Sequence, residues 1–497
     1  MTAPPRLTTH YLHPSPAPGL RFENFRKICV NGFGDGNNAY AHCMAWHQNA
    51  LFVGTTRANL CLIQERLNID IGVWPVECPY KLLSEEFETL QARAEIWKYD
   101  PAGNVWTRIY RAPLVVGSHG GVMSRDLGYR GMVVYQSASD PEPALYTSNW
   151  SRAHGDGPLL LRCRDGATFE VAAQLGRIGG QPVTSLRTLT PFKGQLFIAP
   201  TGAAQGRPNA SRVPEIYTSR DPGRSDWVLV NEPGFGDPDN LTIFEMTVFA
   251  DHLYAGALNN QGFQLWRTAA EGRPPYRWEK VLDHGAERGP LNQLIVSMQV
   301  FQDALYLGTG IQNGGYDYVH KIGPASAEIL RVQDDGSWDL IVGNARQTSQ
   351  GFKRPLSGLN AGFGNFFNAY IWRMGVHDGW LYAGTMDWSN TVRYAQLERR
   401  SPKIRRLYEL IGVENIVTQQ GGFELWRSSD GENWLPVNRQ GFGNPYNYGL
   451  RTLVSTPQGF FLGTANPFGP RVAVQHENQW RYEDNPQGGL EIWLGRR

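Results

Sequence analysis

The chain has little of what marks several large classes of protein. Only 19% of its 497 residues are charged and its formal net charge is +1, so it lacks the basic surface typical of nucleic-acid-binding proteins. No apolar run of about 18 residues occurs, which argues against a membrane-spanning helix. The N-terminal stretch is rich in proline and has no apolar core segment, so no signal peptide is predicted. Neither nucleic acid nor a membrane is expected as a partner.

Cysteine is scarce. The chain contains five cysteines and no Cys-x-x-Cys pair; they are Cys29, Cys43, Cys61, Cys78 and Cys163. An odd number of cysteines without a pairing pattern is typical of reduced thiols. The sequence therefore predicts a cytoplasmic protein with free cysteines.

Motifs for metals, cofactors and activated serines are also missing. The chain has no His-Glu-x-x-His, no EF-hand loop and no Gly-x-Ser-x-Gly elbow. His42 and His47 would lie on opposite faces of a predicted strand, so a shared metal is not expected. The stretches GFGDGN and GTGIQNGG resemble dinucleotide loops, but strands follow them, and the helix N-terminus that a phosphate needs is absent. We predict no cofactor. DPDN at Asp237–Asn240 is a weak calcium candidate and more often a simple turn.

What the sequence contains instead is an internal repeat. The pattern Gly-Phe-Gly-(Asp/Asn)-x-x-Asn occurs at Gly32–Asn38, Gly234–Asn240, Gly362–Asn368 and Gly441–Asn447, and a β-rich run follows each copy. The 56 glycines, 32 prolines and 12% aromatic residues fit many short strands joined by tight turns. A repeat of β units predicts the architecture before any single residue is considered.

Seven units can be aligned, and each is interpreted as a four-stranded antiparallel sheet. Their first two strands begin near Tyr40, Tyr129, Ser185, Ile243, Leu294, Tyr370 and Gly449. The last unit ends after three strands, whereas the segment near Asn24 matches the fourth strands of other units. We therefore predict an all-β, seven-bladed β-propeller at residues 21–497, after a Pro-rich arm at 1–20. The N-terminal strand would complete the last blade and remove an exposed sheet edge.

An asparagine holds the same place before the inner strand in most units. These residues are Asn38, Asn240, Asn292, Asn368 and Asn447, with Asp126 in the second unit and Val183 in the third. We interpret the column as side chains that cap the turn by bonding nearby backbone. The alternative is a ring of amides that coordinates water or a cation such as calcium at the channel mouth.

Turns between third and fourth strands carry a second recurrent pattern. They include Ser428–Trp434 (SSDGENW), Tyr99–Trp106 (YDPAGNVW), Asp334–Trp338 (DDGSW) and Ser219–Trp227 (SRDPGRSDW). These stretches resemble the Asp-box (BNR) turns of sialidase-like propellers. The resemblance implies a propeller whose Asp and Gly fold the turn and whose Trp packs between sheets. In that family the boxes lie away from the catalytic face, so no activity is implied.

The long insertions predict which face carries the site. All of them join second to third strands, at residues 56–94, 149–158, 201–214, 310–327, 386–421 and 465–488. Such loops share one face of a propeller, and loops on a rigid scaffold commonly carry function. The largest insertion, partly helical around 57–94, has a helical pattern from Ser84 to Glu95 with Ser84 as cap. It is either a lid or a strut on the flank of the first blade.

Charged and aromatic residues gather on the inner strands. In the aligned units, the position of Phe244 is occupied by His42, Arg130, Arg187, Trp372 and Arg451. The next position, that of Glu245, is occupied by Cys43 and Arg373 in two other units. Neighbouring positions of an ideal strand point to opposite faces, so only one of these sets should face any given side. Because charges are rarely buried unpaired, the arginines form either an ion-pair network around Glu245 or a pocket for a carboxylate, sulfate, phosphate or phenolate.

Loop residues beyond the strands complete the predicted site. Glu245 or Asp387 would be a general base, and Tyr318 or His320 an acid. Trp372 and Trp388 would offer flat stacking surfaces. The predicted substrate-binding residues are Arg57, Arg130, Arg187, Arg373, Arg451, Trp372, Trp388 and His42.

The repeated residues belong to the turns, whereas the channel residues differ between units. This asymmetry favours one composite site over many equivalent ones. We predict an enzyme, a hydrolase or an alkylating transferase, with a site at the loop-rich mouth for a small anionic or aromatic substrate. The arginine cluster is similar to that by which sialidases grip a carboxylate. Propeller enzymes of secondary metabolism that alkylate phenols or carboxylates share the architecture. The alternatives are a sialidase-like glycoside hydrolase and a non-catalytic scaffold that binds a ligand, or a protein through its upper loops.

Overall fold

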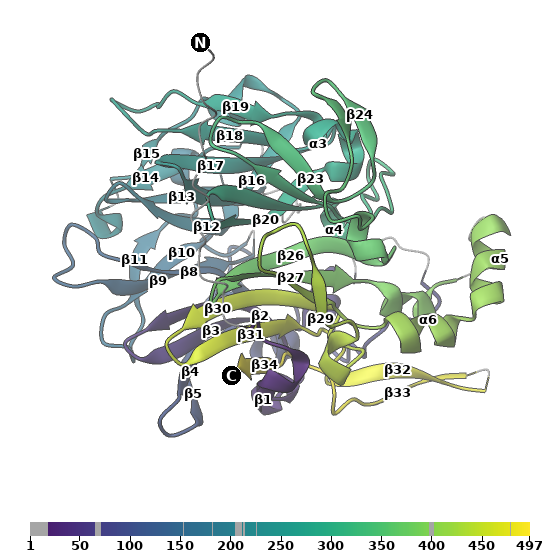
Figure 1. Ribbon diagram of the computed structural model, residues 1–497. Coiled ribbons are helices and arrows are strands. Elements are labelled where there is room, and N and C mark those ends of the chain that lie inside the picture. Colours follow the sequence, from purple (N-terminus) through teal and green to yellow (C-terminus); the bar gives the residue numbers. More distant parts are fainter. Residues whose placement is uncertain are drawn as a thin grey trace, which may run out of the picture.

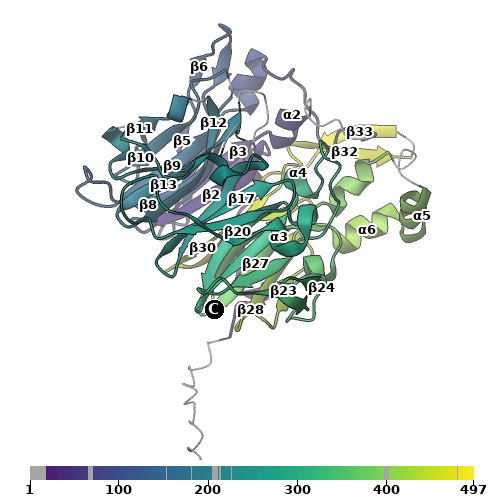
Figure 2. The same cartoon turned by 90° about the horizontal axis from the view of Figure 1, so that it is seen from above.

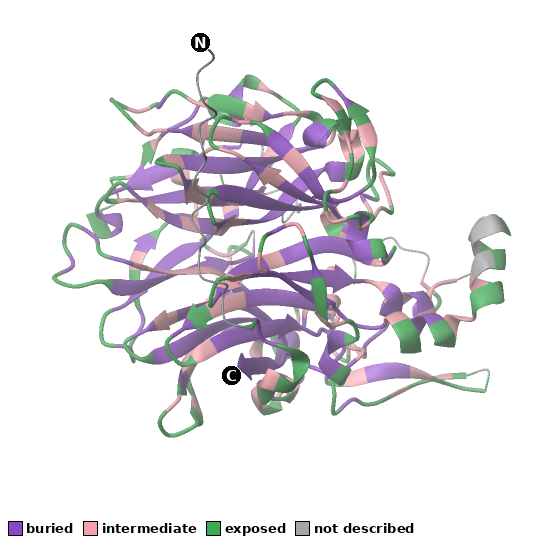
Figure 3. Cartoon of the chain, in the orientation of Figure 1, coloured by how far each residue is buried: buried purple, intermediate pink, exposed green. Residues whose placement is uncertain are grey.

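The computed structural model describes residues 18–497 apart from 65–70, 153, 181, 204–210, 212–213, 225, 397–401 and 478. The predicted arm at 1–20 therefore lies almost wholly outside the described residues. Antiparallel strands dominate the described chain (Figure 1). Most belong to one 24-stranded hydrogen-bonded sheet, and four others form a separate sheet. The strand interiors are mainly buried, and the exposed residues concentrate in the turns (Figure 3).

Pairing divides most strands into units of four antiparallel neighbours. The first three units are β2 (Asn38–His47), β3 (Ala50–Arg57), β4 (Glu95–Asp100) and β5 (Val105–Arg111); β8 (Gly128–Tyr135), β9 (Ala144–Trp150), β10 (Leu159–Cys163) and β11 (Glu170–Gln174); and β12 (Val183–Phe192), β13 (Gln195–Ala203), β14 (Tyr217–Ser219) and β15 (Val228–Leu229). The next three are β16 (Asn240–Phe249), β17 (His252–Asn259), β18 (Gln264–Thr268) and β19 (Glu279–Leu282); β20 (Leu294–Phe301), β21 (Ala304–Gly310), β22 (Ile329–Val332) and β23 (Trp338–Val342); and β26 (Asn368–His377), β27 (Trp380–Asp387), β28 (Leu425–Ser428) and β29 (Leu435–Asn438).

The last unit combines the two ends of the described chain. It consists of β30 (Gly449–Thr456), β31 (Gly459–Ala465), β34 (Ile492–Gly495) and β1 (Phe25–Cys29). β1 runs antiparallel to β34, with Phe25 opposite Gly495 and Lys27 opposite Trp493. The first strand of each unit contacts the first strand of the next, and β30 contacts β2.

The remaining elements are short hairpins and helices between these strands. The hairpins are β6 (Leu114–Val116) with β7 (Val122–Ser124), β24 (Arg346–Thr348) with β25 (Gly351–Lys353), and β32 (Arg471–His476) with β33 (Gln479–Asp484). The α-helices are α1 (Asn31–Gly34), α2 (Asn59–Ile63), α3 (His284–Glu287), α4 (Gln312–Gly315), α5 (Pro402–Ile411) and α6 (Val413–Gln420), beside the π-helical turn η2 (Phe87–Gln91) and short 3-10 helices such as η8 (Ser389–Tyr394). Among the described residues no helix is both long and apolar enough to cross a bilayer.

The helical insertions share one side of the molecule. In Figures 1 and 2, α4, α5, α6 and the β32–β33 hairpin project from the same side. We call it the insertion side. On the opposite side, tight turns join the first and second strands of each unit, as between His47 and Ala50 or between Phe249 and His252. We call this the hairpin side.

The helical part of the largest insertion is fixed to the sheets. The Ser84 hydroxyl accepts a hydrogen bond from the Phe87 amide at 3.2 Å, as a capping serine should. Phe87 and Glu88 are fully buried, and Glu88 pairs with Arg152 while accepting from the Ser124 amide. These contacts favour the strut over the lid.

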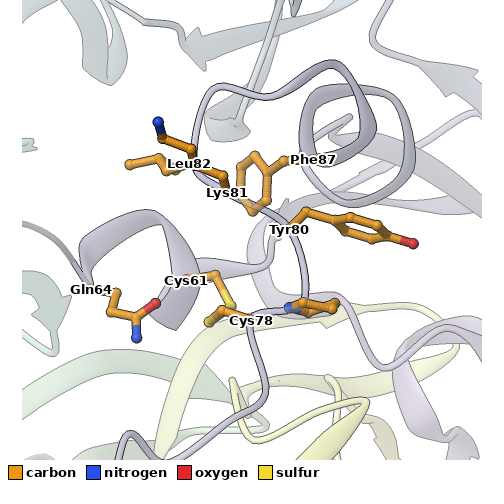
Figure 4. Close-up of a pocket in the computed structure, with 8 residues that line it drawn as sticks. Cys61, Gln64, Cys78, Tyr80, Lys81, Leu82 and Phe87 are labelled. Carbon is orange, nitrogen blue, oxygen red and sulfur yellow. A yellow bond between two sulfur atoms is a disulfide. The ribbon is translucent and has the colours of Figure 1, made fainter.

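The prediction of free cysteines is wrong for two of the five. Cys61 and Cys78 form a disulfide because α2 and the segment that returns past it bring their Cα atoms to 5.7 Å (Figure 4). Cys29, Cys43 and Cys163 are free and buried. Disulfides persist mainly in oxidising compartments, so the cytoplasmic location, which rested on reduced thiols, loses that support.

The repeated asparagine fastens the Gly-Phe-Gly turn. In each of the four copies the Asn side-chain amide donates to the carbonyl of the first motif glycine at 2.9 Å. In three copies it also donates to a third-strand acid or amide: Asn38 to Glu95 (3.0 Å), Asn240 to Gln264 (2.8 Å) and Asn447 to Glu491 (2.7 Å). The prediction that these side chains cap the turn is confirmed.

The same third-strand residue orders the aromatic core beside the turn. Glu95, Gln264, Glu424 and Glu491 each accept from the indole N–H two residues further on, at 2.7 to 3.0 Å. The motif phenylalanines Phe33, Phe235 and Phe363 stack on these indoles at 4.5 to 4.7 Å. Their backbone φ of 54° to 62° is unfavourable for a bulky residue, and the stacking offsets that cost. We call these Asn, acid, Trp and Phe contacts the turn latch.

The turn at Ser428–Trp434 is folded by side-chain hydrogen bonds to its own backbone. The Ser428 hydroxyl accepts from the Gly431 amide at 2.8 Å, and one oxygen of Asp430 accepts from the amides of Glu432 and Asn433 at 2.9 and 2.7 Å. Trp434 at the end of the turn is buried in the core. The turn thus has a local hydrogen-bond function.

We expect the turn latch to be a major source of stability. Asn447→Ala should lower the free energy of unfolding by about 2–3 kcal/mol, because the buried Glu491 carboxylate and the Gly441 carbonyl both lose a donor. Urea denaturation measures this loss. Asn415→Ala is the matched control, since its exposed amide also bonds a backbone carbonyl, and it should cost less than about 0.5 kcal/mol. Equal losses in the two variants would refute a special role for the latch.

Candidate functional site

A cavity of about 190 Å³ lies between the first strands of the units. Residues from every one of those strands line it: β2, β8, β12, β16, β20, β26 and β30. Among the lining residues are most of the predicted inner-strand site residues, namely His42, Arg130, Arg187, Glu245, Trp372, Arg373 and Arg451. The structure therefore brings together residues that are as far as 409 positions apart, from His42 to Arg451.

A β-bulge in each first strand selects the side chains that reach this cavity. The pairing register shifts around the same place in all of them, for example between Ala41 and Cys43 and between Leu450 and Thr452. The unpaired residues are His42, Arg130, Arg187 with Thr188, Phe244, Val296, Trp372 and Arg451, and all of them line the cavity. A bulge bends the strand and re-aims its extra residue.

The bulges also explain why residues of both predicted levels face one cavity. An ideal strand would send Arg373 and Trp372 to opposite faces, yet both line the cavity, as do Glu245 and Phe244. Sequence alternation therefore could not have identified the full lining. Val296 and Thr188 were missed because nothing in their residue type marks them. The only available signal was their alignment with the charged positions of the other units.

The charges in the cavity are unbalanced. Four arginines line it, but Glu245 is the only carboxylate among the lining residues. Arg373 donates to Glu245 at 3.3 Å, and Arg187 donates to the Phe244 carbonyl at 3.2 Å while its guanidinium carbon lies 3.2 Å from the Phe244 ring centroid. One carboxylate cannot neutralise four guanidinium groups. The lining thus contains the Arg373–Glu245 ion pair and more arginines than carboxylates.

Several donors in the cavity wall are buried without an acceptor. Nε and Nη1 of Arg130, Nε of Arg373 and the Thr188 hydroxyl have no hydrogen-bond partner in the described part of the chain. The Arg130 guanidinium lies over the Trp150 ring at 5.1 Å, which compensates only part of its charge. Buried polar groups are normally satisfied, because leaving them unpaired costs free energy.

The neighbouring arginines disfavour one another's charge. Burial, followed by the charge of Arg451, lowers the pKa of Arg130 to about 9. Burial, followed by the charges of Arg373 and Arg187, lowers the pKa of Arg451 to about 9 as well. Because an arginine keeps its proton in proteins, these lowered pKa values indicate an electrostatic cost that a bound anion would relieve. Burial and the same arginines hold the pKa of His42 well below its usual value, so its imidazole is neutral at pH 7.

Aromatic residues separate the cavity from the insertion side. Tyr40, Phe244, Tyr370, Trp372 and Tyr448 belong to one apolar cluster, which we call the aromatic cluster. Tyr40 contacts the Tyr448 hydroxyl and donates to Asn59 at 2.8 Å, and the Tyr370 hydroxyl accepts from the Gly314 amide at 2.8 Å. Tyr40 and Tyr370 are only 8% and 7% exposed. The arginine cavity is therefore not at the loop-rich mouth where the sequence placed the site.

Arg57 was predicted to bind substrate, but the structure assigns it a structural place. Its side chain is fully buried and does not line the cavity. Its guanidinium donates to Asp35 at 2.6 Å and to the Gln91 carbonyl at 3.1 Å, and lies 3.7 Å from Glu95. These partners tie the largest insertion to the first unit and hold Arg57 outside the cavity.

Asp387 was predicted as a general base, but it is not among the residues that line the cavity. It is fully buried at the end of β27, where it accepts from the Ser389 amide at 2.9 Å and from Asn365 at 3.2 Å. Burial, together with the nearby negative charge of Glu424, raises the pKa of Asp387 to about 7. A carboxyl group without solvent access or a place in the cavity cannot reach a substrate.

The remaining loop candidates lie outside the cavity lining. His320 Nδ1 is 2.7 Å from Asp317, and its Nε2 is 3.1 Å from the Asn260 amide. Tyr318 packs edge-on against Tyr316 at 4.8 Å. Burial alone would raise the pKa of Asp317, but hydrogen bonds from Gln293, His320 and Gln312 lower it overall. These residues thus contact one another and do not line the arginine cavity.

Trp388 likewise does not line the cavity. It packs edge-on against Phe367 at 4.8 Å and Phe366 at 5.7 Å. The ring also packs against the apolar cluster that contains Tyr370 and Trp372.

The weak calcium candidate is a turn in this structure. Asp237 accepts from the Asp239 amide at 2.9 Å and from Gln264 at 2.6 Å. In the described ranges no group of three or more His, Cys, Asp or Glu residues is placed to hold a metal ion.

Comparison with known proteins adds little. No protein-family model matches the chain, and no curated protein matches it significantly. Solved structures with some likeness include the family 74 xyloglucanase from Xanthomonas campestris, with 15% identity over 95% of this chain and 56% of the other, at a TM-score of 0.43. An α-L-arabinofuranosidase from Fusarium graminearum shows 11% identity over 73% and 93% of the two chains, at a TM-score of 0.38. A luciferin-regenerating enzyme shows 10% identity over 73% and 87%, at a TM-score of 0.37. The chain thus spans about half of the xyloglucanase, and these likenesses assign it no activity.

Asp387 should make stability fall as pH rises. Its pKa is about 7 in the folded protein against an ordinary value of 3.8, so between those values the folded state binds a proton that the unfolded state has lost. The free energy of unfolding therefore decreases as the pH rises between those two values. Asp387→Asn removes the titration, so the stability of the variant relative to the wild type should rise with pH by up to about 1.4 kcal/mol per unit. Urea denaturation between pH 4.5 and 7.5 measures this difference, with Asp251→Asn at an exposed turn as control. A difference that is constant with pH would contradict the assignment.

Proposed function

We propose that the four-stranded units are the blades of a seven-bladed β-propeller, closed by β1, and that its central cavity binds a small anion. The pairing of β1 with β34 and the contact of β30 with β2 support the closed ring. So does the cavity itself, since a ring brings one bulged residue from every inner strand to a common axis.

The excess of arginines over carboxylates in the cavity lining is the observation that carries the proposal. Four arginines meet one carboxylate in the cavity lining, and donors of Arg130, Arg373 and Thr188 lack acceptors in the described chain. An anion would supply acceptors to these donors and oppose the charge at the same time. Arginine suits this function because its planar fork binds carboxylate, sulfate and phosphate through paired hydrogen bonds.

The size of the cavity restricts the ligand. At about 190 Å³ it is smaller than the pockets of roughly 300–1,000 Å³ that bind drug-sized molecules. A large oligosaccharide or peptide would not fit inside. The proposal is therefore a small carboxylate, sulfate or phosphate.

If the bound anion is a substrate, Glu245 is the group that can act on it. It is the only carboxylate in the lining, and Arg373 holds it in position. We assign Glu245 as general base, accepting a proton from the substrate, and Trp372 as an apolar wall beside the reacting group. A glycoside hydrolase of sialidase type and a non-catalytic scaffold remain the alternatives, and the substitutions below separate ligand binding from structural support.

Arg451→Gln should weaken anion binding. We expect sulfate or acetate affinity to fall at least about tenfold, because one charge-assisted contact is lost. The melting temperature without ligand should not fall, because the substitution also removes repulsion from Arg187 and Arg373. Isothermal titration calorimetry measures the first effect and differential scanning calorimetry the second.

Arg57→Gln is the matched control for that experiment. Arg57 pairs with Asp35 and Glu95 outside the cavity, so its loss should destabilise the protein by about 3–5 kcal/mol and leave anion affinity unchanged where the protein stays folded. If Arg451→Gln instead destabilises the protein and leaves anion affinity intact, the arginines are structural and the proposal fails.

Glu245→Gln should have the opposite effect on binding. Removing the only lining carboxylate takes away repulsion and releases Arg373, so anion affinity should rise about three- to tenfold. Turnover of any substrate found for the cavity should disappear, because glutamine cannot accept the proton. The same titrations measure the first effect. A fall in affinity would mean that the ligand is not an anion.

A further inference from the structure

We infer that the ligand of the arginine cavity is a small carboxylate with an apolar body, and that it enters from the hairpin side. This inference rests on the proposed anion site and adds the chemical class and the direction of entry. Two features carry it: the division of the lining into a charged and an apolar part, and the gradient of exposure along the first strands.

The charged part of the lining lies at the bulges and immediately after them. It comprises Arg130, Arg187, Glu245, Arg373 and Arg451. Most of the lining residues that follow along the first strands are apolar, namely Met44, Met132, Leu189, Leu453 and Val454, beside Gly131, Thr188 and Thr452. They come from four different strands, and all of them line the cavity. A ligand whose anionic group reaches the arginines would thus place the rest of its body against apolar side chains.

The exposure of the first strands shows where the cavity opens. Toward the insertion side the strands are sealed by the aromatic cluster, in which Phe244 and Trp372 are 5% and 7% exposed. Toward the hairpin side, Met132, Leu189 and Val454 are only partly buried. Arg130, Arg187, Glu245 and Arg373 are partly buried to a similar degree, so the cavity is more open toward the hairpin side than toward the aromatic cluster. A ligand that arrives from this side passes the apolar residues before it meets the arginines.

A bare inorganic anion would use only half of this lining. Sulfate or phosphate could satisfy the guanidinium donors, but it would leave the apolar residues around the opening in water. Single exposed apolar residues are ordinary on protein surfaces, whereas apolar residues from several strands that converge on a charged cavity indicate a ligand surface. A carboxylate with an aliphatic or aromatic body fits both parts.

A series of carboxylates of increasing length tests the chemical class. Acetate, butanoate, hexanoate and benzoate would be titrated into the full chain by isothermal calorimetry, with sulfate as the purely polar reference. Affinity should rise about fourfold per buried methylene, and the heat capacity of binding should become more negative along the series.

The outcomes of this series separate the two proposals. If hexanoate and benzoate bind no tighter than acetate although acetate and sulfate bind, the inference is overturned and the anion site stands. If none of these anions binds, the proposed function fails and this inference fails with it.

Isosteric substitutions test the apolar lining. Val454→Thr replaces a methyl by a hydroxyl at the opening, and Val319→Thr makes the same change at an exposed residue of the α4–β22 loop, which lies outside the lining. Val454→Thr should lower hexanoate affinity about fivefold and leave sulfate affinity within twofold, whereas Val319→Thr should change neither. Equal hexanoate affinity in wild type and Val454→Thr would overturn the inference.

Charge substitutions test the direction of entry. Leu453→Glu places a negative charge at the hairpin-side opening and should slow hexanoate association at least tenfold, while Val319→Glu, outside the opening, should not. Stopped-flow quenching of Trp372 fluorescence would report association, because that ring lines the cavity. Unchanged association in Leu453→Glu would overturn entry from this side. If that variant does not fold, Leu189→Glu on β12 repeats the test from another strand.

Discussion

A β-bulge leaves a residue without a partner across a strand pair, and in every first strand of this protein the residues that the shared bulge leaves unpaired, two in β12 and one in each of the others, line the cavity. The rest of the site depends on this constraint. In an unbroken strand the residues of each unit would alternate between the two neighbouring units and would be absorbed into packing. Because the bulge occurs at the same height in all first strands, the unpaired residues converge. The repeat thus places one bulge position of each unit at the cavity, and the residue types at these positions determine the chemistry of the cavity.

The arginines inside and outside the cavity differ in the charges that surround them. Arg57 is surrounded by Asp35, Glu95 and a backbone carbonyl, and each contact ties one segment to another. Arg130 and Arg451 are surrounded mainly by aromatic rings and by other arginines, and burial with like charge lowers their pKa values. In the first arrangement two carboxylates oppose the charge of one arginine. The second lacks negative charge, which a ligand can supply.

Most of the architecture could be predicted because the turn latch leaves a strong pattern in the sequence. Glycine at φ > 0, a phenylalanine that stacks on an indole and an asparagine that bonds the glycine carbonyl are each specific to their place. The Glu-x-Trp of the third strand belongs to the same latch and was overlooked, because its members are distant from the turn in sequence. The pairing of Cys61 with Cys78 was also missed, since nothing in their spacing predicts that α2 lies against the returning chain.

By itself, the sequence determined the repeated β units, the place of the N-terminal strand and the band of charged residues, because these follow from local periodicity and turn chemistry. Only the tertiary structure decided which members of that band share a cavity. Bulges break the alternation on which sequence reasoning depends, and they brought Glu245 and Arg373 beside Arg451. Tertiary packing also removed Arg57 and Asp387 from the site and closed the cavity toward the insertions, since burial among distant segments cannot be derived from neighbours in the chain.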